Sequence, residues 1–177
     1  KDTPAFIGNR VGVYAMAKIY QLTDELDIPI SDVDKLTGPA IGRPKTGTFR
    51  LGDLVGHDTA ANVIKGIRER AVDDEQTAAF EIPKYLQFLL DNKFLGNKSG
   101  QGFYKKTGEK DANGRRIVHA LNLKTLEYEP TQKSDLRSLK LAKQIDDLPK
   151  RLQTLVKAED KGGQLISRSL AGLFAYV

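Results

Sequence analysis

The segment Asn97-Lys98-Ser99-Gly100-Gln101-Gly102-Phe103-Tyr104 lies where the periodicity of the sequence changes. On its N-terminal side, apolar residues recur every three or four positions, as they do on the buried face of an amphipathic helix. On its C-terminal side lies the pair Asn113-Gly114, which is a strong signal for a two-residue β-hairpin turn. We therefore expect a helical domain with a small hairpin excursion near residues 103–129.

The first part of the chain predicts one long helix and one short one. Apolar spacing predicts a helix over residues 6–27, with Thr3-Pro4 at its start, because proline is tolerated in the first helical turn. Pro29 ends this helix, since proline cannot continue it. Ser31 is then placed to cap a short helix over 32–36.

Two further helices are predicted before the glycine-rich segment. Residues 37–49 are rich in glycine and proline, which indicates a loop. Helical spacing returns from about residue 51 to about residue 70, with Gly56 as a break inside that stretch, and again over 83–92.

Beyond the glycines, residues 115–123 and 125–129 are predicted as short strands. From residue 134 onward, leucines at helical spacing predict helices again. The last residues, 170–177, are apolar and carry no polar cap, so we expect that the chain stops within an element.

Composition excludes several classes of protein. The 177 residues are 40% hydrophobic, too apolar for a disordered chain. No cysteine is present, which excludes a disulfide framework and a thiolate nucleophile and fits a cytoplasmic protein. No apolar run is long enough to span a bilayer, so no membrane span is expected.

Charge is distributed unevenly along the chain. Residues 1–90 hold 11 Lys and Arg against 13 Asp and Glu, whereas residues 91–177 hold 17 against 10. A basic half is compatible with a phosphate-rich ligand, with nucleic acid or with an acidic neighbouring domain. Because no stacking platform of aromatics and no recognition motif accompanies the basic residues, we expect no specific nucleic-acid binding.

Three segments, in order, resemble motifs of one enzyme family. They are Asp2-Thr3-Pro4-Ala5-Phe6-Ile7-Gly8-Asn9-Arg10, the stretch from Pro44 to Asp58, and Lys98-Ser99-Gly100-Gln101-Gly102-Phe103-Tyr104. They resemble the patterns D-T-P-G-F-I-x-N-R, G-P-F-x-L-x-D-x-V-G-L-D and K-T/S-G-x-G-F-Y of the 3-hydroxyacyl-CoA dehydrogenases. The resemblance covers about residues 1–106, the usual extent of that family's C-terminal domain.

Departures from the motifs resemble a long, multi-domain branch of the family. Ala5 stands where glycine is common, and Pro-Lys-Thr-Gly-Thr-Phe-Arg replaces the commoner Pro-Met-Gly-Pro-Phe-Glu. In that branch a second, degenerate copy of the domain follows the first. We therefore expect three units: 1–106 as the dehydrogenase C-terminal domain, 107–132 as a hairpin or linker, and 133–177 as the helical start of the second copy.

The resemblance implies a fold and an activity. The fold is all-α, a helical C-terminal domain of the 6-phosphogluconate dehydrogenase-like type with a small β-hairpin insertion. The activity is oxidation of 3-hydroxyacyl-CoA to 3-ketoacyl-CoA in fatty-acid β-oxidation, with NAD as cofactor. The implied partners are the acyl-CoA substrate, the NAD-binding domain of the same parent chain and a second copy in a homodimer. Since this chain shows no glycine-rich phosphate loop and no His–Glu pair, we expect it to be inactive alone.

Asn9 and Lys98 are the residues to which the resemblance gives roles. Asn9 is the catalytic and substrate-binding candidate, since the family's Asn lies beside the catalytic His and helps bind the substrate oxygen. An amide suits this task because it donates and accepts without titrating. The alternative is a helix-start Asn bonded to local backbone. Lys98 is the cofactor-binding candidate for NAD, and the alternative is an ordinary surface lysine.

Phe6, Pro44 and Leu51 are candidates for lining the acyl-chain pocket, although core packing is the stronger interpretation of each taken alone. His57 and His119 have no metal-ligand spacing and no neighbouring nucleophile. We interpret both as non-catalytic and expect no metal site.

Structural roles are expected for the residues around the turn. Asp53 is expected to cap or orient the turn rather than to act in catalysis. Gly100 and Gly102 are expected to allow a tight turn, and Phe103 and Tyr104 to pack it onto the helices.

Two alternative functions stay open at this point. One is a non-catalytic basic helical interaction module, and the other is the helical domain of another β-hydroxyacid dehydrogenase. The Lys98–Tyr104 motif argues against both.

Overall fold

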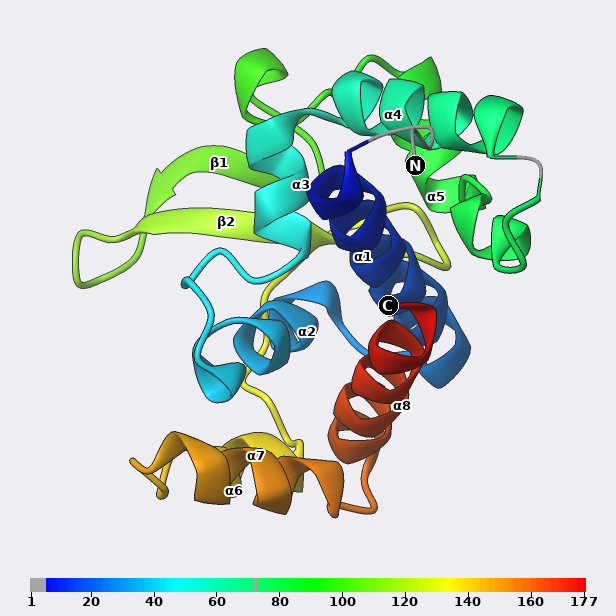
Figure 1. Cartoon of the computed structure of the whole chain (residues 1–177). Coiled ribbons are helices and arrows are strands. Elements are labelled where there is room, and N and C mark those ends of the chain that lie inside the picture. Colours follow the sequence, from blue (N-terminus) through cyan, green and yellow to red (C-terminus); the bar gives the residue numbers. More distant parts are fainter. Residues whose placement is uncertain (1–5, 72) are drawn as a thin grey trace.

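The computed structural model describes residues 6–71 and 73–177, which form eight α-helices and one small antiparallel sheet (Figure 1). The expected helical domain with a small hairpin is therefore confirmed. The expected helix start at Thr3-Pro4 lies outside the described residues.

The first and last helices pack side by side and run antiparallel (Figure 1). Helix α1 spans Ile7–Leu26 and α8 spans Lys161–Tyr176. Tyr14 stacks on Tyr176 with ring centroids 4.0 Å apart, and Arg168 in the middle of α8 binds Glu25 at the end of α1. The two ends of the described chain are thereby joined into one core.

Helix α2 spans Ile30–Thr37 and begins differently from the prediction. Helix α1 ends at Asp27, whose φ of 52° is left-handed, and Pro29 takes the N-cap position of α2. No side chain caps α2, and Ser31 lies inside its first turn, so the predicted Ser31 cap is wrong. The reason is that proline at the cap position already fixes an extended backbone there.

The middle of the chain follows the predicted helices closely. The elements are the 3-10 turn η1 (Pro39–Ile41), α3 (Phe49–Val55), α4 (His57–Arg70), the 3-10 turn η2 (Thr77–Phe80) and α5 (Lys84–Asp91). Gly56 breaks the stretch between α3 and α4, as expected, with a φ of 94°.

The sheet is larger than a hairpin and its first turn differs from the prediction. After η3 (Asn97–Ser99), strands β1 (Tyr104–Lys110), β2 (Arg116–Leu121) and β3 (Tyr128–Pro130) pair in that order. A two-residue turn at Asn113-Gly114 would need positive φ at both residues. Only Gly114 has it, because the Asp111 carboxylate binds the backbone N–H groups of Asn113 and Arg115 and holds a longer turn.

The C-terminal helices are α6 (Arg137–Ala142), α7 (Leu148–Val156) and α8. Asp147 caps α7 and Asp160 caps α8, each accepting a backbone N–H three residues on. Buried residues of these helices belong to the same core as α2 and α3, as shown by Leu36, Phe49, Leu155 and Leu165. The division of the chain at 106 and 132 stays a prediction.

Candidate functional site

A buried carboxylate, Asp53 on α3, holds the glycine-rich turn. Its Oδ1 accepts the backbone N–H of Phe103 at 2.7 Å and its Oδ2 accepts that of Tyr104 at 3.0 Å. Oδ1 also lies 2.9 Å from Nε2 of His57 on α4. One side chain thus joins α3, α4 and the start of β1, which confirms that Asp53 orients the turn.

The two central glycines serve different purposes. Gly102 has no room for a side chain, because an added Cβ would collide with Asp53 Oδ1 and lie 2.7 Å from Gly96 Cα. Gly100 has open space around it but a φ of 77°, which is left-handed. The turn therefore needs glycine at one position for close approach and at the other for backbone conformation.

The two aromatic residues of the motif pack as expected. Phe103 is completely buried, with its ring edge-on to Phe49 at 4.8 Å and tilted against Tyr20 at 5.5 Å. Tyr104 is also buried, and its hydroxyl donates to the carboxylate of Asp34 at 2.6 Å. These contacts fix the turn onto α1, α2 and α3.

Asp34 on α2 is a second buried carboxylate at this junction. It accepts the backbone N–H groups of Thr48, Phe49 and Arg50 at the start of α3, as well as the Tyr104 hydroxyl. Burial raises the pKa of Asp34 to about 6, while the hydrogen bond from Tyr104 and those from the backbone act in the opposite direction. The Arg50 guanidinium lies over the Tyr104 ring, 3.9 Å from its centroid.

His57 and Asp53 are residue types that can act together as an acid–base pair, but both side chains are closed off from solvent. His57 is completely buried, and its ring stands edge-on to Phe103 at 4.7 Å. Asp53 already receives two backbone hydrogen bonds besides that histidine. A substrate cannot reach either group, and the pair serves to hold α3 and α4 together.

Lys98 lies on the surface at the junction between α3 and α4. Its Nζ is 2.6 Å from Oδ2 of Asp58, in the first turn of α4, and it passes close to Gly56. The hydrogen bond from Lys98 lowers the pKa of Asp58 below its ordinary value. The Lys98 side chain is about half exposed, so a ligand can reach it from solvent in competition with Asp58.

Asn9 is exposed in the first turn of α1, and its side chain has no hydrogen-bond partner among residues 6–71 and 73–177. Its neighbour Arg10 behaves differently, since it binds both Asp74 and Tyr176. In the same turn Phe6 is 83% exposed, so the interpretation of Phe6 as a core residue is wrong. Asn9 and Phe6 therefore share an exposed turn that the described fold does not use for packing.

Pro44 and Leu51 belong to the loop before α3 and to α3, whereas Asn9 belongs to α1. Pro44 is exposed in the loop that precedes α3, so its interpretation as a core residue is also wrong. Leu51 is half-buried on α3. The exposed end of that helix is formed by Leu54 and Val55, which lie next to the Gly56–Lys98 contact.

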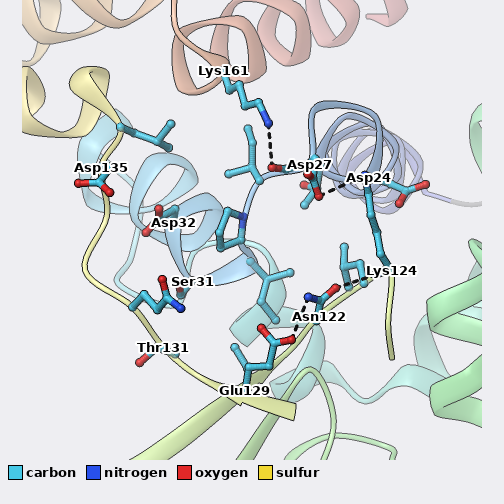
Figure 2. Close-up of a pocket in the computed structure, with 18 of the residues that line it drawn as sticks. Asp24, Asp27, Ser31, Asp32, Asn122, Lys124, Glu129, Thr131, Asp135 and Lys161 are labelled. Atoms are coloured by element: carbon cyan, nitrogen blue, oxygen red, sulfur yellow. Dashed lines mark hydrogen bonds and ion pairs between the residues drawn. The ribbon is translucent and has the colours of Figure 1, made fainter. Parts of the chain in front are cut away.

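Two cavities lie on other parts of the surface. The larger, of about 800 Å³, opens between the end of α1, the sheet and the start of α8. Figure 2 shows Lys161 reaching the backbone of Asp27 and Asn122 bonded to Glu129 at this cavity. Neither Asn9 nor Lys98 lines it.

The described part of the chain holds neither a membrane-spanning helix nor a cluster of metal-ligating side chains. No helix there is long and apolar enough to cross a membrane. No cluster of three or more His, Asp and Glu side chains there is placed to hold a metal ion.

Fold and site together define a helical domain built around a glycine turn that two buried carboxylates hold in place. Residues 6–106 match the model of a family described as 3-hydroxyacyl-CoA dehydrogenase, C-terminal domain. The chain therefore belongs to this family.

Relatives with this name are found in bacteria and animals. The chain is 37% identical over 166 residues to a probable 3-hydroxyacyl-CoA dehydrogenase of Bacillus subtilis, covering 94% of this chain and 20% of that protein. It is 36% identical over 105 residues to the mitochondrial hydroxyacyl-coenzyme A dehydrogenase of Homo sapiens, covering 59% of this chain and 32% of that protein. The chain thus spans about a fifth to a third of the length of these relatives. No solved structure matches it.

Proposed function

We propose that this domain forms the acyl-side wall of the active-site cleft in an NAD-dependent 3-hydroxyacyl-CoA dehydrogenase of fatty-acid oxidation. The observation that carries the proposal is the exposed amide of Asn9, which has no hydrogen-bond partner among residues 6–71 and 73–177, in the same turn as the exposed Phe6 ring. Polar side chains that a fold does not use for its own hydrogen bonds are available for substrate. Membership of the dehydrogenase family supports the same assignment.

Asn9 has a defined task in this reaction. Oxidation removes a hydride from the carbon and a proton from the hydroxyl, so negative charge grows on the oxygen. The Asn9 amide donates a hydrogen bond to that oxygen and stabilises the charge. A base on the NAD-binding domain takes the proton, because the only described His–Asp pair here is buried.

Bound to its own domain, NAD would supply the acceptor for the hydride. Lys98 fits a minor contact with this cofactor, because its ammonium is exposed and a flexible point charge suits a phosphate or ribose edge. Phe6, Leu51 and Pro44 contribute apolar surface toward the acyl chain. We also propose that two copies of the full-length protein form a homodimer.

A comparison of substrates tests the proposed function. The purified full-length protein is incubated with NAD and either 3-hydroxybutyryl-CoA or free 3-hydroxybutyrate, and NADH is followed by absorbance. We expect turnover with the thioester only. Turnover with the free acid alone would assign the domain to another β-hydroxyacid dehydrogenase, and no turnover with either would refute the proposal.

A further inference from the structure

A second cavity, of about 500 Å³, lies between the α2–η1 region and helices α6 and α7. Figure 1 shows these helices on the side of α2 that faces away from α4. The cavity has the size of a small-molecule site. It shares no residue with the turn that carries Asn9 or with Lys98.

The walls of this cavity are strongly basic. Five cationic side chains line it against two carboxylates, and they come from separate segments of the chain: Lys35, Lys45, Arg50, Lys143 and Arg151. The larger cavity has the opposite balance, with seven carboxylates against four cations. The basic character is therefore a local property of the smaller cavity and not a general feature of the surface.

Carboxylates neutralise only part of this charge: Arg50 lies 4.0 Å from Asp34, and Lys35 pairs with Asp32 at 2.8 Å. Asp34 is buried, and its oxygens already accept three backbone N–H groups and the Tyr104 hydroxyl. Asp146 forms no ion pair with any described residue. An incoming anion thus meets an excess of positive charge.

Three of the cations have no carboxylate partner among the described residues. Arg151 donates to the backbone carbonyls of Ala40 and Ile145, which fixes its position without cancelling its charge. Among the described residues, no side-chain hydrogen bond or ion pair is formed by Lys45, in the loop before α3, or by Lys143, at the end of α6. Both are exposed and flexible, and both can turn toward one anion from different walls.

The floor of the cavity is apolar. Ala40, Leu139 and Ala142 are buried beneath it, and Ser31 and Gln132 add polar groups at its edge. A flat ring system can lie on small apolar side chains while its polar edge meets hydroxyl and amide groups. An apolar floor with a basic rim suits a ligand that has both a ring and phosphates.

We propose that this cavity binds a nucleotide-like ligand, with its phosphates on Lys45, Lys143 and Arg151 and its base on the Ala40–Leu139–Ala142 floor. Two sources carry this chemistry: a free nucleotide such as ADP, and the nucleotide end of coenzyme A. Both place two or more phosphate charges next to a flat ring, which matches the separation of basic rim and apolar floor.

Calorimetric titration of this 177-residue chain tests the proposal, with ADP, coenzyme A and inorganic pyrophosphate as probes at low and high salt. The test variant is Lys45→Gln/Lys143→Gln. The matched control is Lys106→Gln/Lys110→Gln, which removes the same charge from exposed positions of β1 outside the cavity. We expect ADP and coenzyme A to bind more tightly than pyrophosphate and more weakly as salt rises. We expect about a tenfold or greater loss of affinity in the test variant only, since charged hydrogen bonds are removed.

Each outcome has a defined meaning. ADP binding that is as tight as that of coenzyme A means that the site recognises the ADP portion that both share. Clearly tighter binding of coenzyme A means that the site also recognises groups that only coenzyme A carries. Both outcomes support the proposal. Binding of pyrophosphate as tight as that of ADP would overturn it, because the floor would then contribute nothing. Equal loss in test and control variants, or no binding of any probe, would overturn it too.

Discussion

Lys98 and Asp58 form an exposed ion pair across the junction of η3 and α4, with Nζ 2.6 Å from Oδ2. The pair lowers the pKa of Asp58. Its stabilising effect is therefore present above the ordinary carboxyl pKa of about 4 and is lost as pH falls through the lower folded-state value. We predict that Lys98→Ala raises the pKa of Asp58 in an NMR titration, while Lys65→Ala, which disrupts a separate pair with Glu69, leaves it unchanged.

Lys98→Ala and Asp58→Asn together separate a cofactor contact from a structural ion pair. In the full-length protein, Lys98→Ala is expected to raise the KM for NAD more than it changes kcat. Asp58→Asn keeps the cation and removes the pair, so its KM for NAD should stay the same or fall. An equal rise in both variants would mean that Lys98 acts only through Asp58.

Asp53 is predicted to be a large contributor to stability. Asp53→Ala leaves two buried backbone N–H groups and His57 without their acceptor. Unsatisfied buried donors cost about 1–3 kcal/mol each, so a loss of roughly 3 kcal/mol or more in the free energy of unfolding is expected. Urea unfolding measures it. Asp91→Ala, at an exposed carboxylate bound only to Gln87, should change stability by no more than about 0.5 kcal/mol. Similar small losses in both would contradict this role of Asp53.

The two glycines of the turn should respond differently to alanine. Gly102→Ala forces a Cβ against Asp53 and Gly96 and is expected to cost about 3 kcal/mol. Gly100→Ala meets open space and only the strain of a left-handed backbone, which costs about 1 kcal/mol. Thermal unfolding of both variants checks the order. A larger loss for Gly100→Ala would mean that close approach at Gly102 is not what the turn requires.

The helices could be predicted from the sequence because their apolar spacing and their breakers agree. The end of α1 before Pro29 and the break at Gly56 are of this kind. The turn after β1 could not be predicted from Asn113-Gly114, since the Asp111 side chain two residues earlier decides its length. A two-residue sequence signal is a weaker predictor of turn type where a nearby carboxylate can bind the backbone N–H groups of the turn.

The site could be predicted only in part, because some of its contacts join residues far apart in the sequence. Motif glycines and aromatics mark the turn, and their packing follows from their types. The contacts of Asp34 with α3 and Tyr104 join residues up to 70 positions apart and leave no periodic signal. Exposure also cannot be read from residue type, which is why Phe6 and Pro44 look like core residues in the sequence and lie on the surface in the fold.

This chain alone is predicted to lack dehydrogenase activity. Its described residues offer no exposed acid–base pair, since His57 is buried on Asp53. The 177-residue chain should form no NADH from 3-hydroxybutyryl-CoA and NAD, and the full-length protein assayed in parallel serves as the control. Turnover that follows the chain through successive purification steps would refute this prediction.

The most direct test of the account is the effect of Asn9→Ala on kcat of the full-length enzyme at saturating substrates. Loss of one hydrogen-bond donor to a developing oxyanion costs roughly 10²–10³ in kcat, and we predict a loss of about 10² here, because the base remains. Since the amide is exposed and has no partner in the described fold, the melting temperature should hardly change. Asp24→Ala, at the other end of α1, should leave both unchanged. A kcat equal to wild type together with a lowered melting temperature would contradict the assignment of Asn9 to the substrate oxygen.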